Sequence, residues 1–160
     1  QLGKINLLNK GKDITLISSS YSTIEILKIY ETLKKNNVSF DHIDLLSIKP
    51  LDIKAIFRSV KKTGKLLILD NSSHSFCSVS SEIVSQLTAI NPKVFKKKPL
   101  ILNLPEIASP SSFYLTKEFY QSEDNLLKSI EKILHKKLKR YLKKNLLPHD
   151  VPDQNFTGPF

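Results

Sequence analysis

The chain has 160 residues, of which 40% are hydrophobic and 25% are charged, a composition that fits one globular domain with a buried core. Its apolar runs are shorter than the roughly 18 residues of a membrane span, and its N-terminal residues lack the layout of a signal peptide. A lone cysteine, Cys77, cannot form an internal disulfide. These features predict a cytoplasmic protein without a membrane partner, while the formal net charge of +10 raises nucleic-acid binding as an alternative.

The hydrophobic pattern alternates between the periods of strands and helices. A continuous apolar run of four to six residues bounded by turn residues indicates a buried strand, and apolar residues three and four apart indicate a helix. In chain order, the pattern predicts an edge strand at 4–8, a strand at 13–18, a helix from Ser22 to about Lys35, a strand at 38–47, a helix between Asp52 and Gly64, a strand at 66–69, a helix at 79–90, a strand at 100–104 and a final helix at 122–146.

The stretch from Val38 to Asp70 shows most clearly how these elements connect. Pro50 ends a strand, Asp52 is a typical helix N-cap, and Gly64 can adopt the left-handed conformation that ends a helix. A strand, a short helix and a second strand form a right-handed parallel unit. The sequence therefore predicts a three-layer α/β/α domain with a mostly parallel sheet of about five strands.

A second strand–helix–strand unit precedes this stretch. In it, Ser22 and Glu25 are spaced as a capping box, in which each side chain satisfies a backbone amide of the other residue. Because the chain contains no methionine and begins at Gln1, we expect it to be a piece of a longer polypeptide.

Several short motifs resemble a known family. They are Gly11–Ser18, Asp44–Leu45, Ser47–Asp52, Ser59–Gly64 and Glu82–Ile83. Together, over roughly residues 3–121, they resemble the C-terminal domain of transketolase-like thiamine diphosphate enzymes. The resemblance is strongest to the beta subunit of the decarboxylating component of 2-oxoacid dehydrogenases, which act on pyruvate or branched-chain 2-oxoacids.

The resemblance implies a domain for assembly rather than catalysis. In the family, thiamine diphosphate and magnesium are held by other domains, so this chain is expected to have no catalytic, cofactor-binding or metal-binding residues. The parent enzyme would decarboxylate a 2-oxoacid and transfer the acyl group to lipoamide. Its expected partners are an alpha subunit, a second beta subunit and the subunit-binding domain of the acyltransferase core. The alternatives are a transketolase or deoxyxylulose-phosphate synthase-like enzyme, and a basic binding module of the same fold.

The chain departs from the family at two places. Leu46 replaces an arginine that relatives commonly carry, and serines including Ser78 and Ser80 replace glycines before a helix. A glycine loop at a helix N-terminus can bind phosphate, whereas serine hydroxyls favour the alternative of a simple helix cap. These departures leave the fold prediction intact but weaken the expectation of a standard active enzyme.

A polar loop is predicted after Asp70, at the carboxyl end of a strand, where open α/β sheets usually bind ligands. His74 and Cys77 within it could form a base and nucleophile pair, but no third residue to orient them is evident, and a loop at a domain interface is the simpler interpretation. Histidines elsewhere are too scattered for a metal site. The candidate loop residues are Asn71, Ser72, His74, Ser78 and Ser80.

The domain is predicted to span residues 1–121, followed by an amphipathic helix at 122–146 that packs on it and an extended tail at 147–160. Basic residues at three- and four-residue steps would share one face of this helix, and Lys96–Lys98 form a second cluster. A solvated face, an acidic protein partner and nucleic acid are the three interpretations; the lack of interleaved aromatic residues disfavours nucleic acid. The candidate docking residues are Lys136, Lys139, Arg140, Lys143, Phe156 and Phe160.

Overall fold

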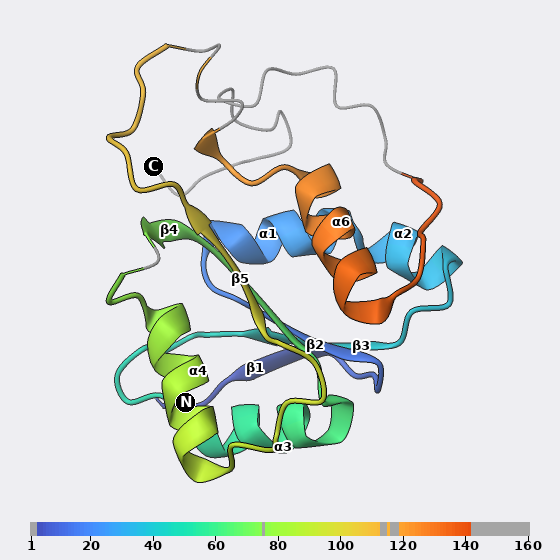
Figure 1. Ribbon diagram of the computed structural model, residues 1–160, viewed down its shortest axis with the longest axis vertical. Coiled ribbons are helices and arrows are strands. Elements are labelled where there is room, and N and C mark those ends of the chain that lie inside the picture. Colours follow the sequence, from blue (N-terminus) through green and yellow to red (C-terminus); the bar gives the residue numbers. More distant parts are fainter. Residues whose placement is uncertain (1–2, 75, 113–114, 116–118, 142–160) are drawn as a thin grey trace.

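A five-stranded sheet runs through the middle of the computed structural model, which describes residues 3–74, 76–112, 115 and 119–141 (Figure 1). The strand order is β1-β3-β2-β4-β5; β1 pairs antiparallel with β3, and the other pairs are parallel. The prediction of a mostly parallel sheet is confirmed. The strands are β1 (Asn6–Asn9), β2 (Ile14–Ser18), β3 (Phe40–Asp44), β4 (Leu66–His74) and β5 (Leu100–Leu104).

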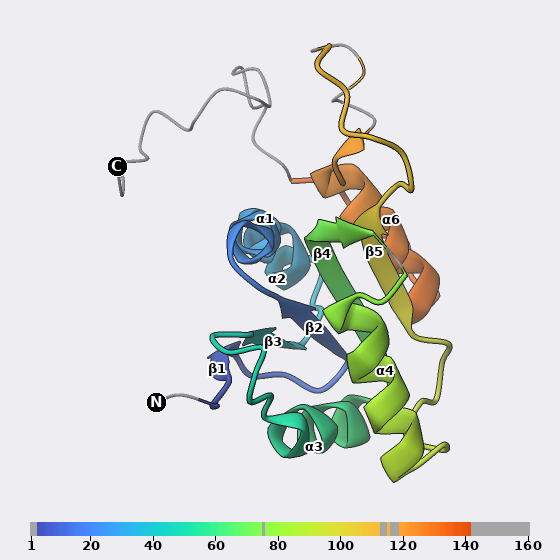
Figure 2. The ribbon, with the colours of Figure 1, turned by 90° about the vertical axis from the view of Figure 1, so that its left-hand side faces the viewer.

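Helices cover both faces of the sheet, which gives the predicted three layers (Figure 2). Ile14 and Leu16 of β2 pack with α1, α2 and α6 in one core, whereas Ile17 packs with α3 and α4 in the other. Because every residue of β2 is buried, the strand needs a helical layer on each side. The helices are α1 (Tyr21–Lys28), α2 (Tyr30–Lys35), α3 (Ile53–Thr63), α4 (Val79–Ile90) and α6 (Glu123–Leu134).

The helix ends that follow the sequence rules are confirmed. Asp52 accepts a hydrogen bond from the amide of Ala55 at 3.1 Å, and Gly64 ends α3 in the left-handed conformation with φ of 70°. The amide of Lys96 donates to the carbonyl of Gly64 at 2.7 Å, and the Lys96 side chain lies where a Cβ at residue 64 would be. Gly64 therefore joins the start of β4 to the segment that leads into β5.

The first helical region differs from the prediction. The helix begins at Tyr21 and breaks at Ile29, so α1 and α2 replace one continuous helix. The predicted capping box is wrong, because the Ser22 hydroxyl instead accepts from the amide of Asn71 at 3.0 Å and Glu25 pairs with Lys28 at 2.8 Å. Ser22 thus connects α1 to β4, far away in the sequence.

The final helix is shorter than predicted. It ends at Leu134, and His135 has a left-handed backbone with φ of 52°. Beyond it the chain turns back, so that Leu138 is buried in the core beside α1 and α2. The leucine spacing continues past the helix because Leu138 is buried by this return, and helical periodicity alone does not distinguish the two cases. Residues 142–146, the tail at 147–160, Lys143, Phe156 and Phe160 lie outside the described residues.

Asp41 on β3 holds three segments together. Its carboxylate accepts from the amide of Gly11 at 2.7 Å, from the Ser59 hydroxyl at 2.5 Å and from the Lys62 ammonium at 2.7 Å. The side chain is almost fully buried, whereas that of Lys62 is half exposed. Most of the stabilisation therefore comes from the buried Ser59 hydroxyl and the half-buried Gly11 amide.

We expect Asp41→Ala to lower the free energy of unfolding by about 3 kcal/mol, because the buried Ser59 hydroxyl and the half-buried Gly11 amide lose their acceptor. Asp124→Ala removes an aspartate that is half exposed, so it should cost less than about 1 kcal/mol. Urea unfolding monitored by circular dichroism checks both values. Equal losses in the two variants would contradict the role given to Asp41.

Candidate functional site

The candidate site lies at the carboxyl edge of the sheet, where β2 and β4 end side by side. The chain leaves β2 for β3 on one side and returns from β3 to β4 on the other, so the strand order reverses at this point. Ligands of open α/β sheets usually bind at such a switch point. A cavity of about 60 Å³ opens here, lined mostly by apolar side chains together with Ser18, Asp70 and Ser80. Small-molecule sites are usually roughly 300–1,000 Å³, so this cavity is small for one.

Ser78 caps α4, and Ser80 lies in its first turn. The Ser78 hydroxyl accepts from the amide of Ser81 at 3.1 Å, as a helix N-cap does. The hydroxyl of Ser80 donates to the Asp70 carboxylate at 2.8 Å, and both side chains are buried. The structure therefore supports the interpretation of a capped helix at Ser78, and it places Ser80 beside Asp70 in the lining of the cavity.

The segment after Asp70 is not the loop that was predicted. β4 continues to His74, so Asn71, Ser72 and His74 lie in a strand, with an irregularity in the pairing to β5 between Asp70 and His74. The parallel partner β5 supports this extension, which the polar sequence conceals. Cys77 is a free, exposed cysteine, and the side chain of His74 lies outside the described part of the structure. The pairing of His74 with Cys77, which the sequence already disfavours, is therefore not tested.

Sequence reasoning missed a buried series of hydrogen-bonded side chains that joins β2, β3, α1 and α2. His42 has no exposed surface; its Nδ1 lies 2.6 Å from the Tyr30 hydroxyl and its Nε2 lies 2.8 Å from the Ser18 hydroxyl. The chain continues from Ser18 to the Thr23 hydroxyl at 2.9 Å and from Thr23 to Asp44 Oδ1 at 2.8 Å. The available signal was a histidine within a predicted buried strand, because such a residue requires hydrogen-bond partners.

Burial determines the protonation of both ring systems in this chain. It lowers the pKa of His42 to about 4 and raises the pKa of Tyr30 to about 12. At neutral pH, the imidazole and the phenol are therefore both uncharged. None of the side chains in this series is charged within the core. Its one carboxylate, Asp44, is half-buried at the carboxyl edge of the sheet.

Two apolar side chains stand out beside the cavity. Leu46 is 61% exposed and Ile48 is 55% exposed, and both follow β3 at the carboxyl edge. Ile48 also lines the cavity. An exposed apolar pair next to an apolar hollow is typical of a surface that contacts protein.

The basic residues after α6 do not share a helix face, which corrects the prediction for Lys136, Lys139 and Arg140. The Lys136 ammonium donates to the carbonyl of Asn36 at 2.5 Å, and the backbone of Lys139 bonds to the Asn36 side chain. The guanidinium of Arg140 pairs with Glu131 at 2.7 Å and with Asp124 at 3.0 Å. Hydrogen bonds from Lys128 and then from Arg140 lower the pKa of the Asp124 carboxyl, and the hydrogen bond from Arg140 lowers that of Glu131. Arg140 is thus used within the chain, where it holds the returning segment onto α6.

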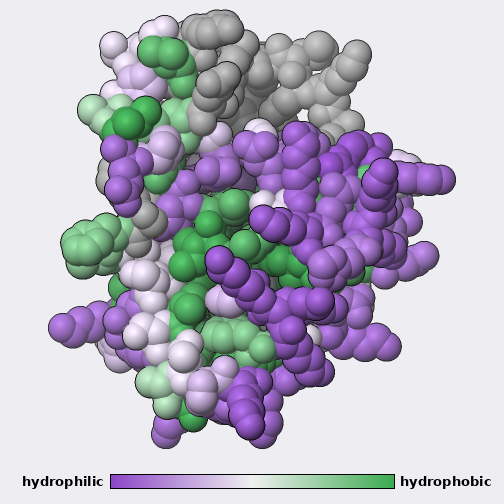
Figure 3. Space-filling view, viewed as in Figure 1, coloured by the Kyte–Doolittle hydropathy of each residue, from purple (hydrophilic) through white to green (hydrophobic). Residues whose placement is uncertain are grey.

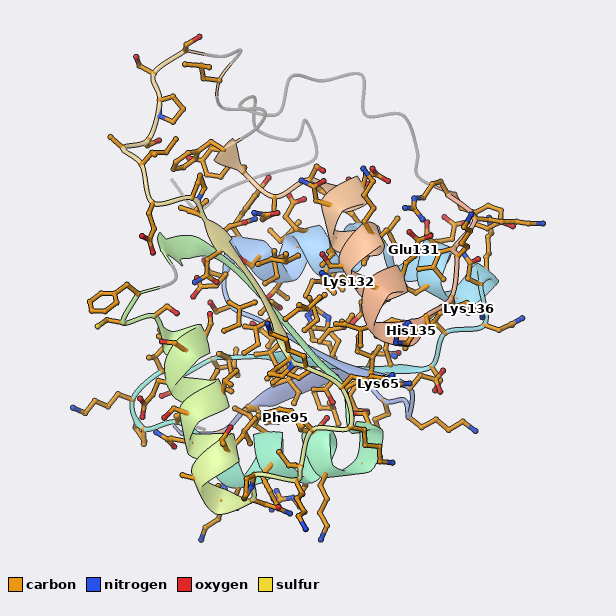
Figure 4. The ribbon with its side chains drawn as sticks, in the orientation of Figure 1. Lys65, Phe95, Glu131, Lys132, His135 and Lys136 are labelled. Carbon is orange, nitrogen blue, oxygen red and sulfur yellow. The ribbon has the colours of Figure 1, made fainter. Side chains whose placement is uncertain are left out.

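The surface on this side of the molecule is divided. Figure 3 shows apolar surface where Figure 1 places β5, between α4 and α6, and hydrophilic surface over α6 and the segment that follows it. Figure 4 places Lys132, His135 and Lys136 at the C-terminal end of α6, on the same side as Lys65.

Within the described part of the chain, no group of three or more His, Cys, Asp or Glu side chains could hold a metal ion. None of the helices described is long and apolar enough to cross a bilayer.

A mostly parallel sheet between two helical layers defines a three-layer α/β domain, and its carboxyl edge carries exposed apolar residues. The match that identifies the family covers residues 3–125 and is described as "Transketolase, C-terminal domain". The chain belongs to the transketolase C-terminal domain family. A solved structure titled "Split gene transketolase, inactive beta4 tetramer" superposes with a TM-score of 0.69 at 18% identity, covering 83% of this chain and 43% of that one, and confirms the fold.

Curated relatives carry the names of enzyme subunits. The chain is 27% identical over 137 residues to "Pyruvate dehydrogenase E1 component subunit beta" of Mesostigma viride, covering 86% of this chain and 42% of that protein. It is 40% identical over 84 residues to the mitochondrial subunit of that name in Chaetomium thermophilum, covering 52% of this chain and 22% of the relative. It is 28% identical over 85 residues to "Acetoin:2,6-dichlorophenolindophenol oxidoreductase subunit beta" of Cupriavidus necator, covering 53% and 25%. The chain thus spans less than half of the length of these relatives.

The lowered pKa of His42 predicts a loss of stability in acid. The unfolded chain binds a proton at this residue near pH 6.5 and the folded chain only near pH 4, so folding becomes less favourable as the pH falls through this interval. Between pH 7 and pH 5 the free energy of unfolding should fall by about 2 kcal/mol from this residue. His42→Gln should remove that part of the pH dependence in urea unfolding, and His135→Gln, at an exposed histidine, should retain it. The same pH slope in wild type and His42→Gln would show that the buried imidazole is not its source.

Proposed function

We propose that the chain is the C-terminal assembly domain of a thiamine diphosphate-dependent enzyme, the beta subunit of a 2-oxoacid dehydrogenase. The parent enzyme decarboxylates a 2-oxoacid and passes the acyl group to lipoamide. Thiamine diphosphate and magnesium are bound by other domains of that enzyme, and this domain supplies contacts to them and to the alpha subunit and second beta subunit. The family membership and the names of the relatives in Mesostigma viride and Chaetomium thermophilum support this proposal.

The observation that carries the proposal is the exposed apolar pair at the carboxyl edge. Leu46 and Ile48 are exposed directly after β3, whereas the apolar residues of β2, β3 and β4 are buried. Covering each of them by a neighbouring domain would stabilise the assembly by roughly 1–2 kcal/mol. The resemblance to the family implies an arginine at the position of Leu46, so this chain would make an apolar contact where a charged residue is expected. The small cavity next to Ile48 would then receive an apolar side chain of the neighbour rather than a substrate.

We expect Leu46→Glu and Ile48→Glu to disrupt assembly of the full-length beta subunit with the alpha subunit, and with it 2-oxoacid-dependent activity. A carboxylate buried in the contact would weaken association by about tenfold or more. Ile90→Glu is the matched control, because Ile90 is 50% exposed at the far end of α4. Analytical ultracentrifugation and an assay of 2-oxoacid decarboxylation measure the two effects. Wild-type assembly of both edge variants would exclude this edge as the contact.

The substrate is tested separately from assembly. Pyruvate is the first candidate because relatives in Mesostigma viride and Chaetomium thermophilum are named for it, and acetoin is the second because of the relative in Cupriavidus necator. The assembled enzyme should reduce an artificial electron acceptor with one of pyruvate, 3-methyl-2-oxobutanoate and acetoin, and only when thiamine diphosphate is added. Ketol transfer between sugar phosphates in the same preparation would instead favour a transketolase.

The C-terminal residues are proposed to bind the acyltransferase core. Phe156 and Phe160 would provide apolar anchors for its subunit-binding domain, and Lys143 with the neighbouring lysines would provide charge. Deleting residues 148–160 from the full-length subunit should lower capture by the immobilised acyltransferase component by about tenfold, because anchors of this kind dominate such interfaces. The Phe156→Ala and Phe160→Ala double variant should reproduce most of that loss. Equal capture of the truncated and complete subunits would refute the docking role of this segment.

A further inference from the structure

The series of hydrogen bonds that links Tyr30, His42, Ser18, Thr23 and Asp44 allows only one arrangement of its protons. At the Asp44 end of this series, the Thr23 hydroxyl donates to the carboxylate oxygen Oδ1 at 2.8 Å, because a carboxylate oxygen accepts. Each hydroxyl has one proton to donate. Thr23 has used its own, so the Ser18 hydroxyl must donate to Thr23, 2.9 Å away. The direction of both bonds is therefore set from the Asp44 end.

The same reasoning assigns the protons of His42. The Ser18 hydroxyl donates to Thr23, so its bond to Nε2 of His42, at 2.8 Å, requires a proton on Nε2. A neutral imidazole with Nε2–H accepts at Nδ1, and the Tyr30 hydroxyl lies 2.6 Å from that atom. All four hydrogen bonds thus run in one direction, from Tyr30 through His42, Ser18 and Thr23 to Asp44.

This series of hydrogen bonds uses only one oxygen of the Asp44 carboxylate. Oδ1 accepts from Thr23, and across the described residues no hydrogen bond or ion pair reaches Oδ2. Asp44 is half-buried as the last residue of β3, and Leu46, two residues further on, is one of the exposed apolar residues of the carboxyl edge. A carboxylate that is held in place beside an apolar contact favours a charged donor as its partner, because charge-assisted bonds are stronger than neutral ones.

We propose that His42 and Tyr30 are positioning residues which, through this one-way chain, hold the Asp44 carboxylate so that Oδ2 receives a lysine or arginine side chain of the neighbouring domain. The inference rests on the proposed assembly function and names one contact within it. Ser18 and Thr23 transmit the orientation, and Asp44 makes the contact. The apolar pair Leu46 and Ile48 supplies burial around the ion pair, and Asp44 supplies its specificity.

The proton arrangement is tested first, in the chain itself. Nitrogen-15 NMR of the His42 ring at pH 7 should show a protonated Nε2 and an unprotonated Nδ1. Asp44→Ala removes the acceptor that fixes the direction, so the His42 signals should move. Tyr30→Phe should leave the proton on Nε2, because the direction is set from the other end, and Asp124→Ala, at an exposed ion pair, should change nothing. A proton on Nδ1 in wild type, or unchanged His42 signals in Asp44→Ala, would contradict the assigned direction of the hydrogen bonds.

The contact is tested next, in the full-length subunit with its alpha partner. Asp44→Ala should weaken association by about tenfold, as the loss of a charge-assisted bond would, and Asp44→Glu should restore part of it. His42→Val should weaken association by less, and together with Asp44→Ala it should add nothing further, because both act through the same carboxylate. If Leu46→Glu weakens association and Asp44→Ala does not, the proposed contact is wrong and the assembly function stands. If neither does, the assembly function itself fails.

Discussion

The fold depends on the burial of β2 on both of its faces. Each residue from Ile14 to Ser18 is buried, and the strand pairs with β3 on one edge and β4 on the other. A parallel strand in this position must be covered by a helical layer above and below, so successive crossovers leave on opposite sides of the sheet. That requirement produces the two cores and also the reversal of strand order where β2 and β4 end. The candidate site is thus a consequence of how β2 is buried.

Much of this architecture follows from local patterns in the sequence. The bounds of α4 and β5, the Asp52 cap and the Gly64 stop were predicted because each depends on residues close in the chain. The failures depend on residues far apart. β4 extends to His74 through its pairing with β5, and the final helix stops at Leu134 because Asn36 and Glu131 bind the returning segment. Hydrophobic periodicity cannot register such partners, so it continued the helix to residue 146.

The candidate site also contains residues that the sequence predicts and residues that it does not. The capping role of Ser78 was predictable from its place before an apolar helix, and the exposure of Leu46 became visible only once the fold was known. His42 was the least predictable residue, because its partners come from β2 and α2 and share no motif with it. The resemblance to the family indicated the role of an assembly domain, and the structure adds the apolar carboxyl edge at which such a contact would form.

The central claim is that this edge meets neighbouring protein in the parent enzyme. The most direct measurement is hydrogen–deuterium exchange of the beta subunit, alone and in complex with the alpha subunit. The account predicts slower exchange on assembly in the segment from Leu45 to Lys49, which carries the exposed apolar pair, and no change around Ile90 at the opposite edge. Exchange at residues 45–49 that is the same in the free and assembled subunits would contradict it.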